Sequence, residues 1–353
     1  METNKALYAY FGQLGLFNDD IPGHTFYQLG LIDELSKMYG VEKFDFLNYV
    51  NPIGDSTSRP VFPRDPLGKV FTKFSDSLID EYQIGSGQVI ENIRNKRYSK
   101  IFLKARFRNL STLQKKLKDA AYFERIIELA LQTGYNPADI VILDTDLSLP
   151  QTFIDTISKL GITRQIPSIT MPGCSQQFIN ECLAVHEKSA NKVPNYLVYY
   201  GNLSFVNYKE GHSKNPIIRD IISAVDETSK FDGTPFSMLL AAKQDPALES
   251  WLAGMKRVAL CSRADRATIW QSMQLAQVSV NVSKDLYLEQ KFTPARVYES
   301  VIFGTIPVSY RDPRFHPAMS FDTVEDFFEI SKFLSDCSSS DYFKILTQIA
   351  SHL

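Results

Sequence analysis

The feature that most limits the fold is a unit of apolar strand, polar loop and helix, which occurs once in each half of the chain. The run Ala6–Phe11 precedes a glycine-containing loop and an amphipathic helix pattern over His24–Tyr39. The run Tyr196–Tyr200 precedes a polar loop and a helix pattern over Pro216–Val225. Such units build parallel sheets covered by helices, so we expect an α/β protein with two Rossmann-like domains. No G-x-G-x-x-G follows the first strand, so a dinucleotide site is not supported.

Composition agrees with two such domains. The chain has 353 residues, of which 44% are hydrophobic and 22% are charged, and this is enough apolar material for two full cores. We expect an N-terminal domain over 1–172, a C-terminal domain over 195–335, and a terminal helix over 336–353 that packs back on the N-terminal domain. The four cysteines lack C-x-x-C spacing, which indicates neither a disulfide framework nor a zinc site.

The N-terminal residues lack the apolar core of a signal peptide, and no apolar run approaches the length of a membrane span. We therefore expect a cytoplasmic protein without membrane contact, and a monomer.

The segment 293–308, T-P-A-R-V-Y-E-S-V-I-F-G-T-I-P-V, contains the clearest candidate for a ligand site. It predicts a helix that starts near Pro294 and ends at Gly304, followed by a buried strand. Arg296 and Glu299 are three residues apart, so they share one face near the start of this helix. The free N–H groups and Arg296 suit a phosphate, and Glu299 can accept two ribose hydroxyls. The alternative is an ordinary surface Arg–Glu pair.

The strongest charge feature is a run of ten Lys and Arg residues, with no acid between Arg94 and Lys118. Within 101–108, apolar residues alternate with positions that include Lys104, Arg106 and Arg108, which predicts a strand with one basic face. A basic run is usually a solvated face. In a chain of net charge −2, however, so many uncompensated cations favour an anionic partner. DNA is the natural candidate, because phosphate contacts need Lys and Arg but no sequence code.

A second acidic feature follows the strand pattern over Ile140–Leu143. Asp144-Thr145-Asp146 comes directly after it, where polar groups face the ligand crevice of an open α/β sheet. D-x-D at a strand end can hold a divalent metal. Alternatively, Asp146 is a general base that takes the proton from an acceptor hydroxyl, and Asp144 orients it or raises its pKa. The third interpretation of this motif is that an Asp caps the next helix.

Three stretches of the chain resemble a known family. R-V-Y-E and G-T-I-P-V of 293–308 resemble the nucleotide-sugar half of GT-B glycosyltransferases, and R-V-Y-E is similar to the R-V-W-E of the DNA β-glucosyltransferases of T-even bacteriophages. L-D-T-D-L-S-L-P at 143–150 is similar to the F-T-D-I-R-L-P of that family, and I-P-G-H-T-F-Y at 21–27 is similar to its V-P-S-S-E-T-I-Y. The pieces come in the same order and span most of the chain. The resemblance implies a GT-B fold, with two Rossmann-like domains facing a central cleft.

The resemblance also implies an activity. It makes Asp146 the catalytic base and favours this role over metal binding, because GT-A folds have no use for the later R-V-Y-E segment. His24 stands where the family has an acid near the sugar, so it is the second catalytic candidate. The implied reaction is inverting transfer of a sugar from a UDP-sugar onto a hydroxymethylated pyrimidine, 5-hydroxymethylcytosine, in double-stranded phage DNA. The location would then be the host cytoplasm. The sequence requires no divalent metal such as Mg²⁺ or Mn²⁺, and we assign no metal ligand.

Further donor-binding residues follow from the same resemblance. Gly201 starts the loop that carries arginines onto the donor diphosphate in that family, and here Lys209 and Lys214 stand nearby instead. Arg263 lies in the turn where GT-B enzymes offer backbone groups to the nucleotide base. Two alternatives remain at this point. One is a GT-B transferase acting on a lipid or polysaccharide, and the other is a non-catalytic nucleic-acid-binding protein with the same fold.

Overall fold

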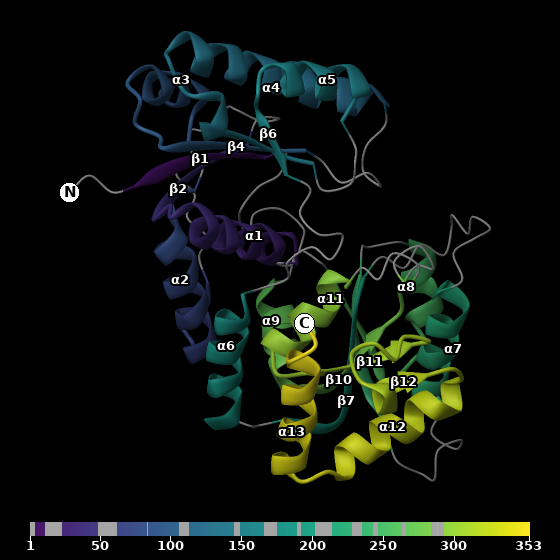
Figure 1. Cartoon of the computed structure of the whole chain (residues 1–353). Coiled ribbons are helices and arrows are strands. Elements are labelled where there is room, and N and C mark those ends of the chain that lie inside the picture. The colour runs from purple at the N-terminus through teal and green to yellow at the C-terminus, as the bar shows by residue number, and fades with distance from the viewer. Residues whose placement is uncertain are drawn as a thin grey trace. The chain divides into compact units, whose positions relative to one another are not determined.

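The computed structural model describes residues 4–10, 23–48, 62–82, 84–105, 113–144, 149–165, 175–188, 192–201, 214–227, 235–242, 246–262, 266–283, 288 and 293–353. They form two compact units, each built on its own six-stranded sheet (Figure 1). Residues 24–175 and the N-terminal strand belong to the first unit, and 176–353 belong to the second.

The first unit has a parallel sheet in the order β3-β2-β1-β4-β5-β6. Its strands are β1 (Lys5–Tyr10), β2 (Lys43–Asn48), β3 (Ile79–Glu81), β4 (Lys100–Lys104), β5 (Ile140–Leu143) and β6 (Thr163–Gln165). Its helices are α1 (Gly23–Tyr39), α2 (Pro66–Leu78), α3 (Ser86–Arg94), α4 (Leu113–Gln132) and α5 (Gln151–Lys159). The strand order reverses between β1 and β4, as in a Rossmann sheet.

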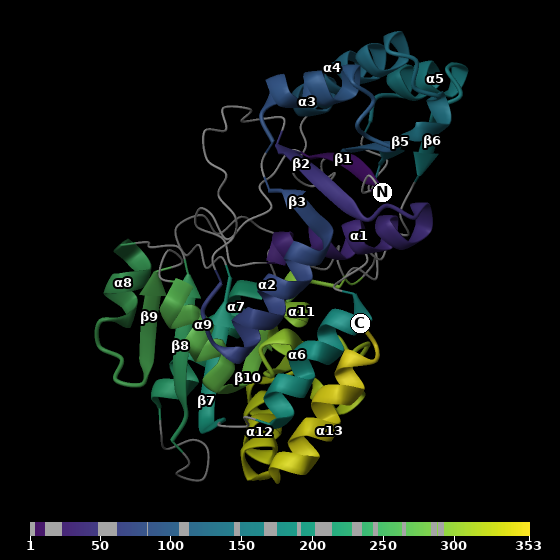
Figure 2. The same ribbon diagram turned by 90° about the vertical axis from the view of Figure 1, so that its left-hand side faces the viewer.

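The strands of this sheet are buried on both faces. Leu7 and Ile101 face a core shared with α3, α4 and α5, whereas Tyr8 and Phe102 face a core shared with α1. Figures 1 and 2 show these two sets of helices on opposite faces of the sheet. The prediction of a strand with one basic face is therefore wrong for the described strand β4. A central parallel strand is covered by helices on both sides, so even Lys104 is fully buried.

The second unit repeats this order, as β12-β11-β10-β7-β8-β9, and is again all parallel. Its strands are β7 (Val193–Tyr200), β8 (Ser237–Ala242), β9 (Val258–Ser262), β10 (Ala276–Asn281), β11 (Ile306–Tyr310) and β12 (Ser320–Phe321). Its helices are α6 (Gln176–Lys188), α7 (Lys214–Asp226), α8 (Pro246–Leu252), α9 (Arg266–Leu275), α11 (Ala295–Ile302), α12 (Val324–Asp336) and α13 (Ser339–Ala350). The predicted α/β fold with two Rossmann-like sheets, as in GT-B proteins, is confirmed.

Local signals fix several helix ends. Asp65 caps α2 by accepting from the backbone N–H of Gly68 at 2.7 Å. Thr323 and Asp326 form a capping box at the start of α12. Gly304 follows α11 with a φ of 72°, a left-handed conformation that glycine adopts without strain, and this lets the chain turn directly into β11.

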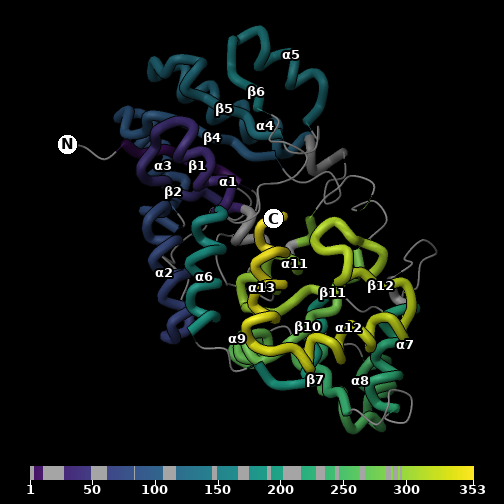
Figure 3. Tube along the Cα trace, turned by 60° about the horizontal axis from the view of Figure 1, so that its bottom comes forward, coloured from purple at the N-terminus to yellow at the C-terminus, as the bar shows by residue number. Residues whose placement is uncertain are grey.

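The C-terminal helix packs within the second unit. Tyr342 of α13 donates a hydrogen bond to the carbonyl of Gln277 at 2.5 Å and accepts one from the N–H of Ile306 at 3.2 Å. Figure 3 shows α13, in yellow, beside α11. Residues 336–353 therefore belong to the second unit, and the expectation that they pack back on the N-terminal domain stays a prediction. The boundary between the units falls at 175/176 rather than 172, so α6 belongs to the second unit. None of the helices in the described ranges has the length and hydrophobicity needed to cross a membrane.

Candidate functional site

The candidate site lies at the carboxyl edge of the second sheet, where the strand order reverses between β7 and β10. These two strands pair in register, with Leu197 opposite Val278 and Val198 opposite Ser279. In open α/β sheets, the ligand crevice lies outside the carboxyl ends of the strands at such a reversal. Tyr199 and Gly201 stand at the end of β7, and Asn281 stands at the end of β10.

Arg296 reaches this edge from the first turn of α11. Its guanidinium carbon lies 4.8 Å from the centroid of the Tyr199 ring. A Cβ placed on Gly201 would lie 2.5 Å from Nη2 of Arg296 and 2.7 Å from Oη of Tyr199. Real Cβ atoms do not approach other atoms so closely, so a side chain at this position would require the ends of Arg296 and Tyr199 to shift. The structure therefore brings together two residues that the sequence predicted to bind the donor, Gly201 and Arg296.

Glu299 lies one turn further along α11 and is only 1% exposed. An ordinary surface Arg–Glu pair therefore does not describe this helix. The helix is tied to the sheet by hydroxyl groups. Ser300 donates to the carbonyl of Arg296 at 2.7 Å and lies 2.6 Å from the hydroxyl of Ser279 on β10. These contacts fix the first turns of α11, and so the start of the Arg296 side chain, against the edge of the sheet.

Several buried polar atoms at this edge have no hydrogen-bond partner within the part of the chain that the structure describes. They are Oη of Tyr199, Oδ1 of Asn281, Oγ of Ser283 and Nε of Arg296. Burying a polar group without a partner costs free energy, so such a cluster is typical of a ligand site. Arg296 and Ser283 can donate to phosphate oxygens, whereas Asn281 and Glu299 can accept from hydroxyls.

Three of these residues escaped the sequence analysis, namely Tyr199, Asn281 and Ser283. A signal was available for two of them. The pattern V-S-V-N-V-S over 278–283 places Asn281 and Ser283 where a buried strand ends, which is the place where α/β proteins hold polar ligand contacts. Tyr199 reads as an ordinary strand residue, and only its contact with Arg296 identifies it.

The other predicted donor residues fall largely outside the described part of the chain. Lys214 is the first residue of α7, and its side chain is not described. Lys209 and Arg263 lie outside the described residues. Their assignment to the donor site stays a prediction.

In the first unit, Asp144 follows β5 directly and is fully buried. Its Oδ2 accepts from Nη2 of Arg164 at 2.6 Å and from Nε at 3.2 Å. The Asp144 carboxylate is therefore paired with a cation, and its expected effect on Asp146 stays a prediction. Asp146 itself lies outside the described residues, and His24 lies in the first turn of α1 with its side chain not described.

The predicted DNA contacts need one correction. Lys104 is buried, with its ammonium nitrogen 4.3 Å from the centroid of the Tyr10 ring, so it is no surface contact for DNA phosphates. Arg106 and Arg108 lie outside the described residues. The described cations of the basic run that are exposed lie instead near the end of α3 and on α4, and they are Arg94, Lys96, Arg97 and Lys118.

In the described ranges, no group of three or more His, Cys, Asp or Glu side chains could hold a metal ion. Asp144, the described carboxylate of the D-x-D motif, is occupied by Arg164.

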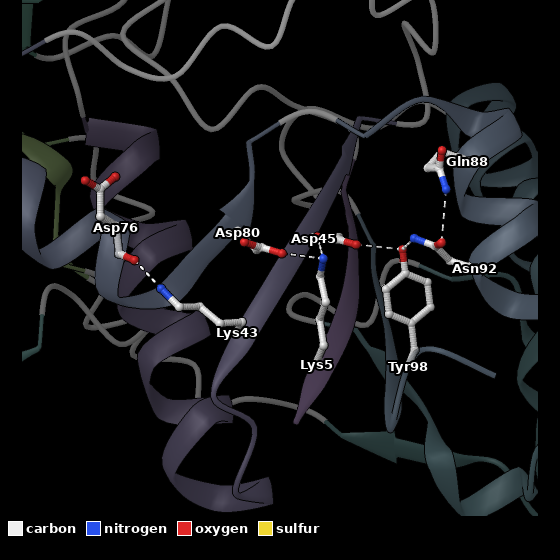
Figure 4. Close-up of polar contacts among 8 residues, drawn as sticks. All are labelled: Lys5, Lys43, Asp45, Asp76, Asp80, Gln88, Asn92 and Tyr98. Carbon is white, nitrogen blue, oxygen red and sulfur yellow. Dashed lines mark hydrogen bonds and ion pairs between the residues drawn. The ribbon is translucent and has the colours of Figure 1, made fainter. Parts of the chain in front are cut away.

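A second polar cluster in the first unit is structural (Figure 4). Lys5 of β1 lies 2.7 Å from Asp45 of β2 and 2.5 Å from Asp80 of β3. Asp45 also accepts from Tyr98 at 2.9 Å, and Asn92 donates to Tyr98 at 3.0 Å. Burial raises the pKa of Asp45, although Lys5 and Tyr98 oppose the shift. These partners satisfy one another, so the cluster joins three strands and leaves no group for a substrate.

Comparisons with known proteins yield structural neighbours only. No family model and no curated protein matches the sequence. Among solved structures, the chain is similar to the β-glucosyltransferase of phage T4 in complex with UDP-glucose, with 11% identity, a TM-score of 0.43, and coverage of 98% of this chain and 94% of that one. It is also similar to an O-GlcNAc transferase of Thermobaculum terrenum (12% identity, TM-score 0.41, coverage 100% and 63%) and to an E. coli heptosyltransferase with ADP (9% identity, TM-score 0.38, coverage 87% and 86%). The T4 enzyme whose motifs the sequence resembles is thus among the similar structures.

Proposed function

We propose that this protein is a GT-B glycosyltransferase that moves a sugar from a UDP-sugar onto 5-hydroxymethylcytosine in DNA. The observation that carries the proposal is the polar site at the carboxyl edge of the second sheet. There, the Arg296 guanidinium lies close to the backbone of Gly201. Glu299 is buried one turn further along the same helix.

The donor half of the proposal uses these residues in distinct roles. Arg296 and the free N–H groups at the start of α11 bind the diphosphate, because a guanidinium and a helix N-terminus both favour phosphate oxygens. Gly201 lets the diphosphate come close to the backbone, because it has no side chain in the way. Glu299 accepts the two ribose hydroxyls. Lys209 and Lys214 add charge next to the diphosphate, and Arg263 lies beside the base.

The acceptor half of the proposal rests on the sequence motifs. Asp146, two residues beyond Asp144, takes the proton from the hydroxymethyl group as its oxygen attacks the anomeric carbon of the sugar. The bond from that carbon to the diphosphate breaks in the same step, and UDP leaves with the bonding electrons. A single displacement of this kind inverts the anomeric centre. His24 contacts the sugar. The target base is flipped out of the duplex, because a stacked base cannot enter such a site. Arg106 and Arg108 contact phosphates of the DNA backbone.

The donor site is tested with two nucleotides, UDP and 2′-deoxy-UDP, which differ only in the ribose 2′-hydroxyl. Wild-type protein should bind UDP more tightly than 2′-deoxy-UDP, because Glu299 accepts the 2′-hydroxyl. Glu299→Ala should bind both equally, and Arg296→Ala should bind both about tenfold or more weakly than wild type, since a charge-assisted contact is lost. Titration calorimetry measures all four affinities. Retention of the preference for UDP in Glu299→Ala, together with unchanged affinity in Arg296→Ala, would contradict the assignment.

A further inference from the structure

We propose that Tyr199 is a positioning residue of the donor site, which holds the Arg296 guanidinium in the orientation that binds a diphosphate. The proposal rests on the proposed function, because it concerns the same nucleotide site. It adds a residue that neither the motifs nor the basic run indicated.

The first observation is the geometry of the ring and the cation. The Arg296 guanidinium carbon lies 4.8 Å from the centroid of the Tyr199 ring, and the ring is fully buried. A cation within about 6 Å of an aromatic face is attracted by the negative charge of that face, and more so where water is excluded. A long arginine side chain otherwise samples many rotamers, and fixing them costs conformational entropy when a ligand binds. A ring that already holds the guanidinium removes part of this cost.

The second observation is the state of the guanidinium itself. Nε of Arg296 is buried and has no hydrogen-bond partner among the residues that the structure describes. The Tyr199 ring contacts this charged group, and its Nε–H is available to an anion. The Tyr199 hydroxyl lies close to the backbone of Gly201, because a Cβ on Gly201 would clash with both Oη of Tyr199 and Nη2 of Arg296. Ring, guanidinium and bare backbone thus lie in contact at the strand ends, where we place the diphosphate.

The proposal predicts that Tyr199 acts on phosphate binding and acts through Arg296. Tyr199→Met keeps a long apolar side chain but removes the aromatic face. It should lower affinity for UDP by roughly tenfold and leave affinity for uridine unchanged, because uridine has no phosphate for Arg296 to bind. Tyr199→Phe keeps the face and should bind UDP within about twofold of wild type.

A double variant separates positioning from general damage. If Tyr199 acts only through Arg296, the pair Tyr199→Met and Arg296→Ala should bind UDP no more weakly than Arg296→Ala alone. Tyr196→Leu, a change to a half-buried tyrosine earlier on the same strand, serves as the matched control and should bind both ligands like wild type. Thermal melting checks that each variant is folded. If Tyr199→Met does not fold, Tyr199→Leu replaces it.

The outcomes are distinguishable by calorimetry with UDP and uridine. Additive losses in the double variant, an equal loss for uridine, or a Tyr199→Phe variant as weak as Tyr199→Met would each overturn the role of Tyr199. Unchanged UDP affinity in Tyr199→Met would overturn it as well, while a loss in Arg296→Ala would leave the donor site standing. Unchanged UDP affinity in Arg296→Ala would instead remove the donor site on which the inference rests.

Discussion

At the scale of single residues, Gly201 is the most constrained position of the candidate site. Its φ lies outside the left-handed region, so the requirement for glycine comes from space and not from backbone strain. The two groups that a Cβ would meet are the Arg296 guanidinium and the Tyr199 hydroxyl, which are the ends of side chains and can move. A methyl group at this position would therefore displace the proposed phosphate contacts and leave the fold intact.

Gly201→Ala should accordingly lower affinity for UDP by about tenfold, the order expected for a displaced charge-assisted contact, with little change in melting temperature. Gly254→Ala is the matched control, because a Cβ at Gly254 meets no atom within 4 Å. Calorimetry with UDP measures both variants. Equal affinity in Gly201→Ala and wild type would show that the diphosphate does not approach this backbone.

Single residues also show which parts of the site could be predicted from the sequence and which could not. Arg296 and Glu299 could be assigned because their spacing on one helix is a local property. The neighbourhood of Gly201 and Arg296 could not be derived from spacing, because it joins the end of β7 to the start of α11. Lys104 was misjudged for a related reason. Alternation along one strand is visible in the sequence, but the helices that cover its second face are supplied by distant segments.

At the scale of elements, helix α11 is anchored at the end opposite to Arg296. Lys192 donates to the carbonyls of Gln274 and Phe303, at 2.8 and 3.1 Å, and to the hydroxyl of Thr305 at 3.3 Å. A hydrogen-bond donor suits this place, because α9 and α11 both end there and the last carbonyls of a helix lack partners within it. His186 contacts the carbonyl of Ile302 at 2.8 Å. The site thus depends on a helix that is held at both ends.

Burial lowers the pKa of the Lys192 ammonium to about 7, from 10.5 in an unfolded chain. Between these two values the unfolded chain binds the proton and the folded chain does not, so this residue makes stability rise as pH rises from about 7 to 10.5. Below pH 7 both states are charged, and the cost of burial is constant. The melting temperature of wild type minus that of Lys192→Met should therefore increase over this pH range. A difference that stays flat or falls would show that Lys192 keeps its charge in the folded protein.

The helix and strand of 293–308 were predicted well because their signals are local. Pro294 precedes the first turn as the cap residue, and Gly304 takes the left-handed conformation that ends a helix. The placement of α13 shows the opposite case. Its helical pattern was recognised, but its docking uses buried side chains such as Leu346 and Ile349 and the hydroxyl of Tyr342, which bonds to residues far away in the sequence.

At the scale of the whole molecule, the chain builds the same strand order twice and puts different chemistry at the two carboxyl edges. The edge of the second sheet has the Arg296 guanidinium, the bare backbone of Gly201 and the buried Glu299. The edge of the first sheet has a buried lysine, Lys104, and the buried Asp144 paired with the half-buried Arg164. Under the proposed function, the second unit binds the donor and the first unit supplies the base and the DNA contacts.

Electrostatic binding of DNA predicts a salt dependence. Replacing Arg106 and Arg108 together with Ala should weaken DNA binding and lower the slope of log affinity against log salt by about 2, since each phosphate contact contributes about 0.9. Affinity for UDP should stay the same. Lys256→Ala with Lys344→Ala removes two exposed charges from the second unit and is the matched control. If the control pair and the arginine pair change the slope equally, the basic run has no special part in DNA binding.

The measurement that tests the central claim most directly is the mass of the DNA product. The protein is incubated with a panel of UDP-sugars and with DNA that contains either 5-hydroxymethylcytosine or unmodified cytosine. The DNA is then digested, and the masses of the nucleosides are measured by mass spectrometry. The account predicts that the hydroxymethylated nucleoside gains the mass of one sugar and that unmodified cytosine gains none. Asp146→Asn should lower the single-turnover rate by about two to four orders of magnitude with UDP affinity unchanged. Intact UDP binding with no gain of mass on any nucleoside, for any sugar of the panel, would contradict the account.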